Sequence, residues 1–446
     1  MAKGERAPRE APDARSVAAR VLERVLYGGA FAAAALDVEI RRTPQLEARD
    51  RGLATELVYG VLRTRRALIA RLEAHAPRGL PDDARVRTHL LVAAYQVLLL
   101  DRVPPHAAVD AAVRAVKSAR GEKMSGFANA VLRKLAAGEK LTREQAVLEN
   151  APSWLVDELT ASVGADEARA LLGAGGGATD PEPTVAIRLV GNRYERFEWL
   201  SSAAKGRVSP IARLVPRGGN LSRREGYAEG AFVVQEEGAQ VVALALGARP
   251  GDSVLDACAG RGQKTTLLRE RVGPGARLWA ADLYAEKLAA QGAEMKRLGL
   301  VPAKTVAVDL GVGTAGLPRG FDRVLVDAPC TGTGTLRRRP EILLRLVPED
   351  PPRLAALSEA ILRRAAGLAR PGGRVVFAVC SVLRAECEAV VERVSDILAP
   401  APFDAPELEG LVRGPGPGQG ETELRLSPGR HGHGTDGFYM KSMVRR

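Results

Sequence analysis

The amino-acid sequence predicts an all-helical region followed by a doubly wound α/β domain, and two periodicities carry this prediction. From Ser16 to about Leu135, apolar residues recur every three or four positions, which is the spacing of an amphipathic helix. From Ser253 onward, short apolar runs alternate with amphipathic segments, as in a mostly parallel sheet that helices cover on both faces. The chain of 446 residues is 46% hydrophobic and 26% charged, so it can bury the cores of two or three domains.

Glycine and proline divide the first region into separate helices. They cluster at residues 27–29, 77–81 and 103–105. The helix expected after Pro105 carries Arg114, Lys117 and Arg120 at three-residue spacing. These cations share one side of the helix, which is either an RNA-binding stripe or a solvated face.

The basic charge is concentrated in the same region. Residues 1–150 hold 26 Lys and Arg against 18 Asp and Glu, which accounts for +8 of the net charge of +12. Such a surplus favours polyanions through counterion release, but it is equally common in proteins that never bind RNA. Charge alone therefore leaves nucleic-acid binding open.

The period changes after a glycine-rich linker at residues 173–183, and residues 184–190 alternate like a strand. Strand, turn and helix then repeat. The expected strands are 253–260, 277–283, 304–310, 322–330 and 373–381, and the expected helices are 264–272, 285–299 and about 352–369.

Acidic residues stand at the ends of four of these strands, at Asp256, Asp282, Asp309 and Asp327. Ligands of doubly wound sheets bind beyond the carboxyl ends of the strands. The first turn, residues 259–264, reads Ala-Gly-Arg-Gly-Gln-Lys and opens a helix whose amides can hold an anion. Asp282 follows Gly262 by 20 residues, the separation that suits a ribose-binding acid. Because the turn lacks the GxGxxG spacing of dinucleotide sites, we expect S-adenosylmethionine instead.

The four cysteines, at 258, 330, 380 and 387, form no CxxC pair, so we expect neither a disulfide scaffold nor a metal site. Few cysteines without a disulfide pattern fit a reducing compartment, and we expect a cytoplasmic location. Cys330 and Cys380 follow strands that would be neighbours, which should bring both sulfur atoms to one pocket beside Asp327. Lys264 and the arginines at 337–339 are candidate neighbours that would favour a thiolate.

Two thiols and an acid suit methyl transfer to C5 of a cytosine. C5 becomes nucleophilic once a thiolate adds to C6, and an acid near N3, such as Asp327, takes up the developing charge. The C5 proton must then leave, and a second cysteine could serve as the base. We expect Cys387, in a helical segment, to be a spectator, and Cys258 to pack as a small side chain in the first turn.

Several segments resemble the RsmB (Fmu/Sun, NSUN-type) family of RNA cytosine-C5 methyltransferases. In the second half they are 256–259 with 262–265, 327–330 and 379–381, together with 232–246 and 433–444. In the first half, residues 50–64, 95–113 and 126–135 resemble the NusB-like RNA-binding domain of the family's small-subunit rRNA enzymes.

The resemblance implies a Rossmann-like S-adenosylmethionine methyltransferase domain preceded by an all-α NusB-like domain. The implied division is residues 1–145 for the NusB-like domain, 146–230 for a connector and a small α/β RNA-binding segment, and 231–446 for the catalytic domain.

The resemblance also implies roles. Cys380 would attack C6, Cys330 would be needed for product release, Asp327 would lie between cofactor and base, and Lys264 would support them. The implied cofactor-binding residues are Cys258, Ala259, Gly260, Arg261, Gly262, Gln263, Lys264, Asp282, Asp309 and Asp327.

The turn departs from the family's usual Ala-Pro-Gly-Gly-Lys at Gly260, Arg261 and Gln263. If residue 263 needed a positive φ, glutamine would cost about 1 kcal/mol or more, and cofactor affinity would fall.

We therefore expect methylation of C5 of a cytosine in small-subunit (16S) rRNA, by a monomer that needs no metal and no membrane. Two alternatives stay open. One is a non-catalytic RNA-binding factor in ribosome assembly or antitermination, and the other is a tRNA cytosine-C5 methyltransferase.

Overall fold

The computed structural model describes residues 13–174, 184–216, 220–412, 420–431 and 435–446, so most of the predicted linker at 173–183 lies outside it. The chain divides into two compact units. The helical unit comprises the chain up to residue 152 with residues 172–174 and 339–345, and the sheet unit comprises the remainder.

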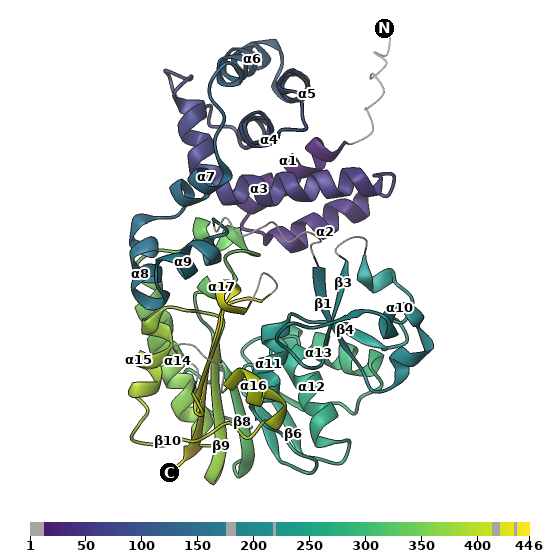
Figure 1. Ribbon diagram of the computed structural model, residues 1–446, viewed down its shortest axis with the longest axis vertical. Coiled ribbons are helices and arrows are strands. Elements are labelled where there is room, and N and C mark those ends of the chain that lie inside the picture. The colour runs from purple at the N-terminus through teal and green to yellow at the C-terminus, as the bar shows by residue number, and fades with distance from the viewer. Residues whose placement is uncertain (1–12, 175–183, 217–219, 413–419, 432–434) are drawn as a thin grey trace. The chain divides into compact units, whose positions relative to one another are not determined.

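The helical unit consists of amphipathic helices, as the periodicity predicts (Figure 1). Asp13 caps the first helix by accepting a hydrogen bond from the Ser16 amide, and Asp83 caps the fourth through the Val86 amide. The predicted breaks fall between helices. The helices are α1 (Ala14–Leu26), α2 (Ala32–Arg42), α3 (Ala48–Glu73), α4 (Ala84–Leu99), α5 (Pro105–Arg120), α6 (Glu122–Ala136) and α7 (Arg143–Asn150).

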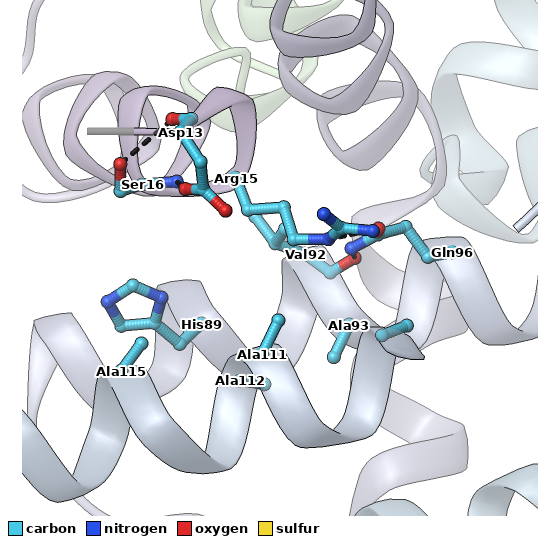
Figure 2. A pocket seen from close by; sticks show the side chains of 11 residues that line it. Asp13, Arg15, Ser16, His89, Val92, Ala93, Gln96, Ala111, Ala112 and Ala115 are labelled. Atoms are coloured by element: carbon cyan, nitrogen blue, oxygen red, sulfur yellow. Dashed lines mark hydrogen bonds between the residues drawn. The ribbon is translucent and has the colours of Figure 1, made fainter. Parts of the chain in front are cut away.

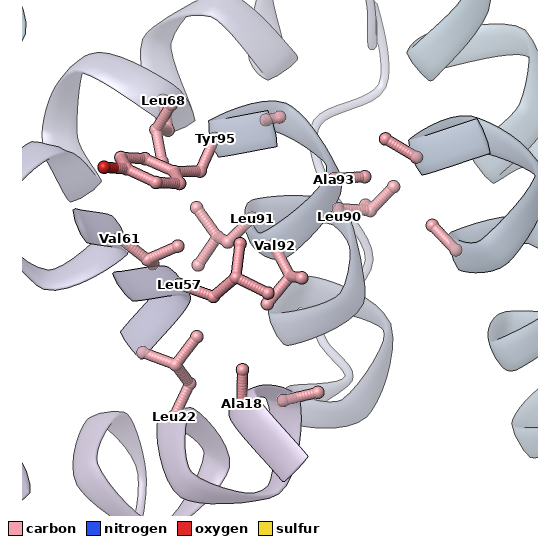
Figure 3. Packing of buried hydrophobic residues seen from close by; sticks show 14 of the residues in the cluster. Ala18, Leu22, Leu57, Val61, Leu68, Leu90, Leu91, Val92, Ala93 and Tyr95 are labelled. Carbon is pink, nitrogen blue, oxygen red and sulfur yellow. The ribbon is translucent and has the colours of Figure 1, made fainter. Parts of the chain in front are cut away.

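The core of the helical unit forms where α1, α3 and α4 meet (Figure 3). Leu22, Leu57 and Leu90 are fully buried there. Gly60 of α3 admits the ring of Tyr95, because a Cβ at position 60 would lie 2.1 Å from Tyr95 Cζ. The Tyr95 hydroxyl donates to Glu56 Oε1 at 2.5 Å, so the buried ring keeps a partner for its polar atom.

The sheet unit begins with two helices and a small antiparallel sheet. Strand β1 lies between β3 and β4, and β2 extends the sheet beyond β3. The elements are α8 (Ser153–Val163), α9 (Ala165–Leu172), β1 (Thr184–Leu189), α10 (Glu198–Ser201), β2 (Ala204–Lys205), β3 (Ala212–Pro216) and β4 (Phe232–Val234).

The main sheet has the predicted parallel centre, with strand order β10-β12-β9-β8-β5-β6-β7 and β11 paired to β12. All pairs from β9 to β7 are parallel, whereas β12 joins β9 antiparallel. The strands are β5 (Val254–Asp256), β6 (Leu278–Asp282), β7 (Lys304–Ala307), β8 (Phe321–Asp327), β9 (Ala369–Val379), β10 (Leu398–Pro400), β11 (Glu423–Leu426) and β12 (Phe438–Arg445).

Helices cover both faces of this sheet, which makes it doubly wound. Alternate strand residues point to opposite faces: Val324 packs in the core with α14 (Asp350–Ala366) and α15 (Glu388–Glu392), while Leu325 packs with α11 (Glu237–Ala245) and α12 (Gln263–Val272). Helix α13 (Ala285–Arg297) adds Met295 to the second face. The strand ends carrying the predicted site residues thus emerge from a rigid, two-sided core.

Candidate active site

Three of the four predicted acids occupy the last positions of their strands. Asp256, Asp282 and Asp327 end β5, β6 and β8, and Asp309 follows the end of β7 by two residues. Because these strands run parallel, their carboxyl ends share one edge of the sheet. The acids that the sequence singles out are therefore gathered on one rim.

The turn after β5 has its two left-handed positions at Gly260 (φ 54°) and Gly262 (φ 82°). A Cβ at position 262 would lie 2.3 Å from Gln291 Cγ, whereas one at position 260 would meet nothing within 4 Å. Gln263 is the first residue of α12, and no non-glycine residue among those described has a positive φ. The backbone cost considered for Gln263 is therefore not incurred.

Asp282 and Asp256 each accept hydrogen bonds from nearby backbone or side-chain groups. Asp282 accepts hydrogen bonds from the amides of Gly260 and Tyr284, both at 2.9 Å. Asp256 is buried and accepts from the Thr265 hydroxyl at 2.7 Å, but its Oδ1 has no partner. Burial raises the pKa of Asp256 to about 6, although the Thr265 hydrogen bond acts in the other direction.

Asp309 differs from these acids because it is exposed, with its Oδ1 accepting from the Gly311 amide at 2.8 Å. Apolar side chains lie near the acids in sequence: Leu283 is 54% exposed and Val312 is 76% exposed. The sequence analysis did not select these two residues. The sequence does contain one indication of them. Each is an apolar residue that stands shortly after a strand-end acid, where the chain is expected to be exposed.

Lys264 and Asp327 form an ion pair across the site, with Nζ 2.5 Å from Oδ2. Their side chains are only 16% and 21% exposed. Burial lowers the pKa of Lys264, but the charges of Asp327, Asp256 and Cys380 raise it more, so the net pKa lies above its ordinary value. Lys264 therefore stays protonated in the site.

The two cysteines meet as the strand order predicts. Cys330 follows β8, Cys380 follows β9, and their sulfur atoms lie 3.5 Å apart. The hydrogen bond to Cys380 raises the pKa of Cys330 well above its ordinary value, and burial adds to the shift. Cys330 therefore holds its proton tightly.

The other two cysteines lie apart from this chemistry. Burial raises the pKa of Cys387 well above the usual range and also raises that of Cys258. Cys258 sits at the start of the glycine turn, whereas Cys387 donates to the Ser381 carbonyl at 3.5 Å. Neither thiol has the character of a nucleophile.

The arginine run has a structural role at its centre. The Arg338 guanidinium makes a two-pronged ion pair with the buried carboxylate of Asp436, through Nε at 2.7 Å and through a second nitrogen. Arg338 therefore ties the loop after Cys330 to the segment that precedes β12.

The helical unit contains a small cavity. The cavity in Figure 2, between α1, α4 and α5, has a volume of only about 40 Å³, which admits water but no nucleotide. No group of three or more His, Cys, Asp or Glu side chains in the described ranges could hold a metal ion. Among the helices in those ranges, none is both long enough and apolar enough to span a bilayer.

Comparison with solved structures agrees with the fold described above. The crystal structure of PH0851 matches over 97% of this chain and 99% of that chain, with a TM-score of 0.80 and 22% identity. The structure of NSun6 from Pyrococcus horikoshii with SFG covers 66% of this chain and 98% of its own, with a TM-score of 0.56 and 17% identity.

Comparison of sequences goes further. The profile of the NusB family matches residues 12–137, and that of the 16S rRNA methyltransferase RsmB/F family matches residues 243–444. The probable ribosomal RNA small subunit methyltransferase B of Synechocystis is 30% identical, over 96% of this chain and 99% of its own length. The ribosomal RNA small subunit methyltransferase B of Salmonella paratyphi C is 29% identical, over 97% of this chain and 98% of its own length. With a NusB domain, a methyltransferase domain and relatives similar from end to end, this chain belongs to the RsmB/F family of 16S rRNA methyltransferases.

Proposed function

We propose that this protein methylates C5 of a cytosine in small-subunit rRNA, with S-adenosylmethionine as the methyl donor. The observation that carries the proposal is the pair of sulfur atoms, 3.5 Å apart, next to the strand end that bears the Lys264–Asp327 ion pair. Methyl transfer follows from the family. The names of relatives that match nearly the whole chain support small-subunit rRNA as the substrate.

The residues at the rim fit S-adenosylmethionine. The glycine turn within residues 258–264 offers open space at Gly260, and Asp256, which ends β5 at the same edge, has a buried oxygen without a partner. Asp282 would accept from the ribose, and Asp309 and Asp327 would complete the cofactor site. The exposed side chains of Leu283 and Val312 would cover the faces of an adenine ring. When bound, this cofactor supplies an electrophilic methyl group.

The two thiols would take different roles in the reaction. Cys330 holds its proton while the Cys380 thiolate adds to C6 of the cytosine. Once the sulfur of Cys380 is bonded to carbon, its negative charge is gone, and with it the main cause of the raised Cys330 pKa. C5 of the adduct takes up the methyl group and still carries its original proton. Cys330 can then lose its own proton to solvent and remove the proton from C5. The C6–S bond breaks, and Cys380 leaves as a thiolate.

Lys264 and Asp327 would serve the same reaction. The protonated ammonium of Lys264 lies near Cys380, where it would face the sulfur atom that attacks C6. Asp327 would face N3 of the cytosine and would stabilise the charge that develops on the ring. The ion pair fixes the orientation of both groups.

The small antiparallel sheet would offer a second surface for RNA, within the RNA-binding segment that we expect at residues 146–230. A pocket of about 850 Å³ there is lined by Trp199 and by the exposed Lys205, Arg207 and Arg224. The Arg224 guanidinium stacks 3.7 Å from the centre of the Trp199 ring. Arginine planes and aromatic rings support unpaired bases, and the cations suit phosphates.

Single cysteine variants test the proposal. Cys380→Ala should abolish methyl transfer while RNA still binds, and Cys330→Ala should leave RNA covalently attached, seen as a complex that survives denaturing electrophoresis. Cys387→Ala, which alters a buried thiol outside the pair, is the matched control and should retain transfer. Normal turnover by both Cys330→Ala and Cys380→Ala would refute the two-thiol mechanism.

Two further measurements separate the alternatives. Calorimetry with S-adenosylmethionine should show binding, whereas no binding at millimolar ligand would indicate a non-catalytic RNA-binding factor. Small-subunit rRNA and tRNA from cells lacking the gene should be offered in parallel, and 5-methylcytosine should be located by mass spectrometry. Methylation of tRNA alone would refute the rRNA assignment.

A further inference from the structure

A buried carboxylate joins the two loops that carry the thiols. Glu386, at the end of a short 3-10 helix (Arg384–Glu386), is only 1% exposed. Its Oε1 accepts from the Thr331 amide at 2.7 Å. Its Oε2 accepts from the hydroxyls of Thr331 and Ser381, both at 2.5 Å. One side chain therefore contacts the residue that follows Cys330 and the residue that follows Cys380.

Further bonds between the same two loops make the connection rigid. Thr333 Oγ1 and Ser381 Oγ lie 3.0 Å apart, and the Gly334 amide donates to the Cys380 carbonyl at 3.0 Å. Thr331, Thr333 and Ser381 are all buried, so water does not compete for these bonds. Of the bonds described, those to Glu386 are the ones that converge on a single carboxyl group from both loops.

The chemical character of Glu386 favours a positioning role over simple packing. A buried carboxylate is costly unless it is fully hydrogen-bonded, and its three bonds here all come from neutral donors in the two thiol-bearing loops. An apolar side chain could fill this volume, but it could not hold both loops in one register. The spacing of the sulfur atoms is the property that this carboxylate can set.

We propose that Glu386 is a positioning residue, which fixes the distance between Cys330 and Cys380 by holding the backbone next to each. The expected effect of Glu386 on turnover rests on the function proposed above. Its expected effect on the distance between the two sulfur atoms does not. Geometry within about 1 Å is decisive for reactions of this type, and misplacement of that size can cost about 100-fold in rate.

Three variants test the role. Glu386→Ala removes all three bonds, Ser381→Ala removes one hydroxyl, and Glu386→Gln keeps an oxygen for the Thr331 amide but can place a donor group against the two hydroxyls. The matched control is Glu388→Ala, which removes an acid two residues away that pairs with Arg425. Urea unfolding identifies the variants that fold.

The first readout is independent of methyl transfer. Diamide oxidises two nearby thiols to a disulfide by taking up two electrons and two protons, and mass spectrometry measures the rate of the Cys330–Cys380 bond. A disulfide needs a separation of about 2.05 Å, so the rate depends on how well the loops hold the sulfur atoms together. We expect Glu386→Ala to slow this rate about tenfold or more, and Glu388→Ala to leave it unchanged.

The second readout is turnover. Glu386→Ala should lower kcat about 100-fold, with the KM for RNA and the dissociation constant of S-adenosylmethionine unchanged, and Ser381→Ala should show a smaller loss of the same kind. If Glu386→Ala does not fold, Ser381→Ala and Glu386→Gln decide. Wild-type oxidation rates in the folded variants would overturn the positioning role. Absent transfer in the wild type would overturn the proposed function and leave the oxidation test intact.

Discussion

The Lys264–Asp327 ion pair allows the burial of the candidate site to be measured as a free energy. Removing one partner of a buried pair costs about 3–5 kcal/mol, whereas an exposed pair is worth about 1 kcal/mol or less. The side chains of this pair are 16% and 21% exposed, and so lie closer to the buried case. We therefore expect Lys264→Met to lower the free energy of unfolding of the sheet unit by about 2–3 kcal/mol.

A double-mutant cycle isolates the interaction. Asp327→Asn removes the other charge, and the double variant leaves neither charge of the pair in the site. Its loss should be smaller than the sum of the single losses by about 1–2 kcal/mol. As a control, Lys287→Met breaks a looser pair with Asp282, at 3.5 Å and with the lysine 38% exposed, and it should cost about 1 kcal/mol or less.

The assay is urea unfolding followed by tryptophan fluorescence. All three tryptophans, Trp154, Trp199 and Trp279, belong to the sheet unit, so the signal reports the unit that contains the pair. If Lys264→Met changed stability no more than Lys287→Met, and the cycle showed additive losses, the pair would be screened by water. The account of the site as a buried electrostatic centre would then be refuted.

Three further predictions concern other parts of the fold. The pKa of Asp256 is raised from 3.8 to about 6 by burial, so the folded state holds this proton more tightly. The bound proton stabilises the folded state by at most about 3 kcal/mol; this stabilisation is fully present below about pH 4 and is lost by about pH 6. The urea midpoint should therefore fall as the pH rises between these values, and Asp256→Asn should remove that dependence on pH. Gly262→Ala should destabilise the sheet unit by about 2–4 kcal/mol and Gly260→Ala by about 1 kcal/mol. Both positions have a positive φ, but only position 262 also lacks space for a Cβ atom. Equal losses in unfolding followed by fluorescence would contradict this prediction. Gly60→Ala should lower the stability of the helical unit by about 1–2 kcal/mol, because the added methyl group overlaps the Tyr95 ring. In a Tyr95→Ala background the same change should stabilise the unit, because alanine favours a helix more than glycine does. Thermal unfolding followed by circular dichroism measures both effects.

Much of the candidate site could be predicted because parallel strands impose a simple rule. Once strands ending at Asp256, Asp282 and Asp327 are recognised, their carboxyl ends must lie on one edge. Cys330 and Cys380 follow adjacent strands, so their proximity also follows from the order of the elements. The distance of 3.5 Å between their sulfur atoms depends on the loops after the strands, which have no periodicity to interpret.

Other features depend on contacts that local sequence does not encode. The pattern of residues 438–445 does not show that they form a strand of the main sheet, because the place of β12 depends on its antiparallel pairing with β9. Likewise, the turn could place its left-handed residues at several positions, and only the structure shows that both fall on glycine and spare Gln263. Glu386 gives no local signal, since its partners lie at positions 331 and 381.

The position of β12 has a consequence for the order in which the protein matures during synthesis. This strand is made after both β9 and β10, yet it lies between them in the sheet. The Gly437 amide, just before it, donates to the Gly334 carbonyl at 2.7 Å, within the loop that follows Cys330. Until the ribosome has delivered this segment, the nascent domain leaves the flank of β9 open to aggregation and the thiol-bearing loop without its last support. Chains that stop before β12 are therefore expected to be insoluble and inert.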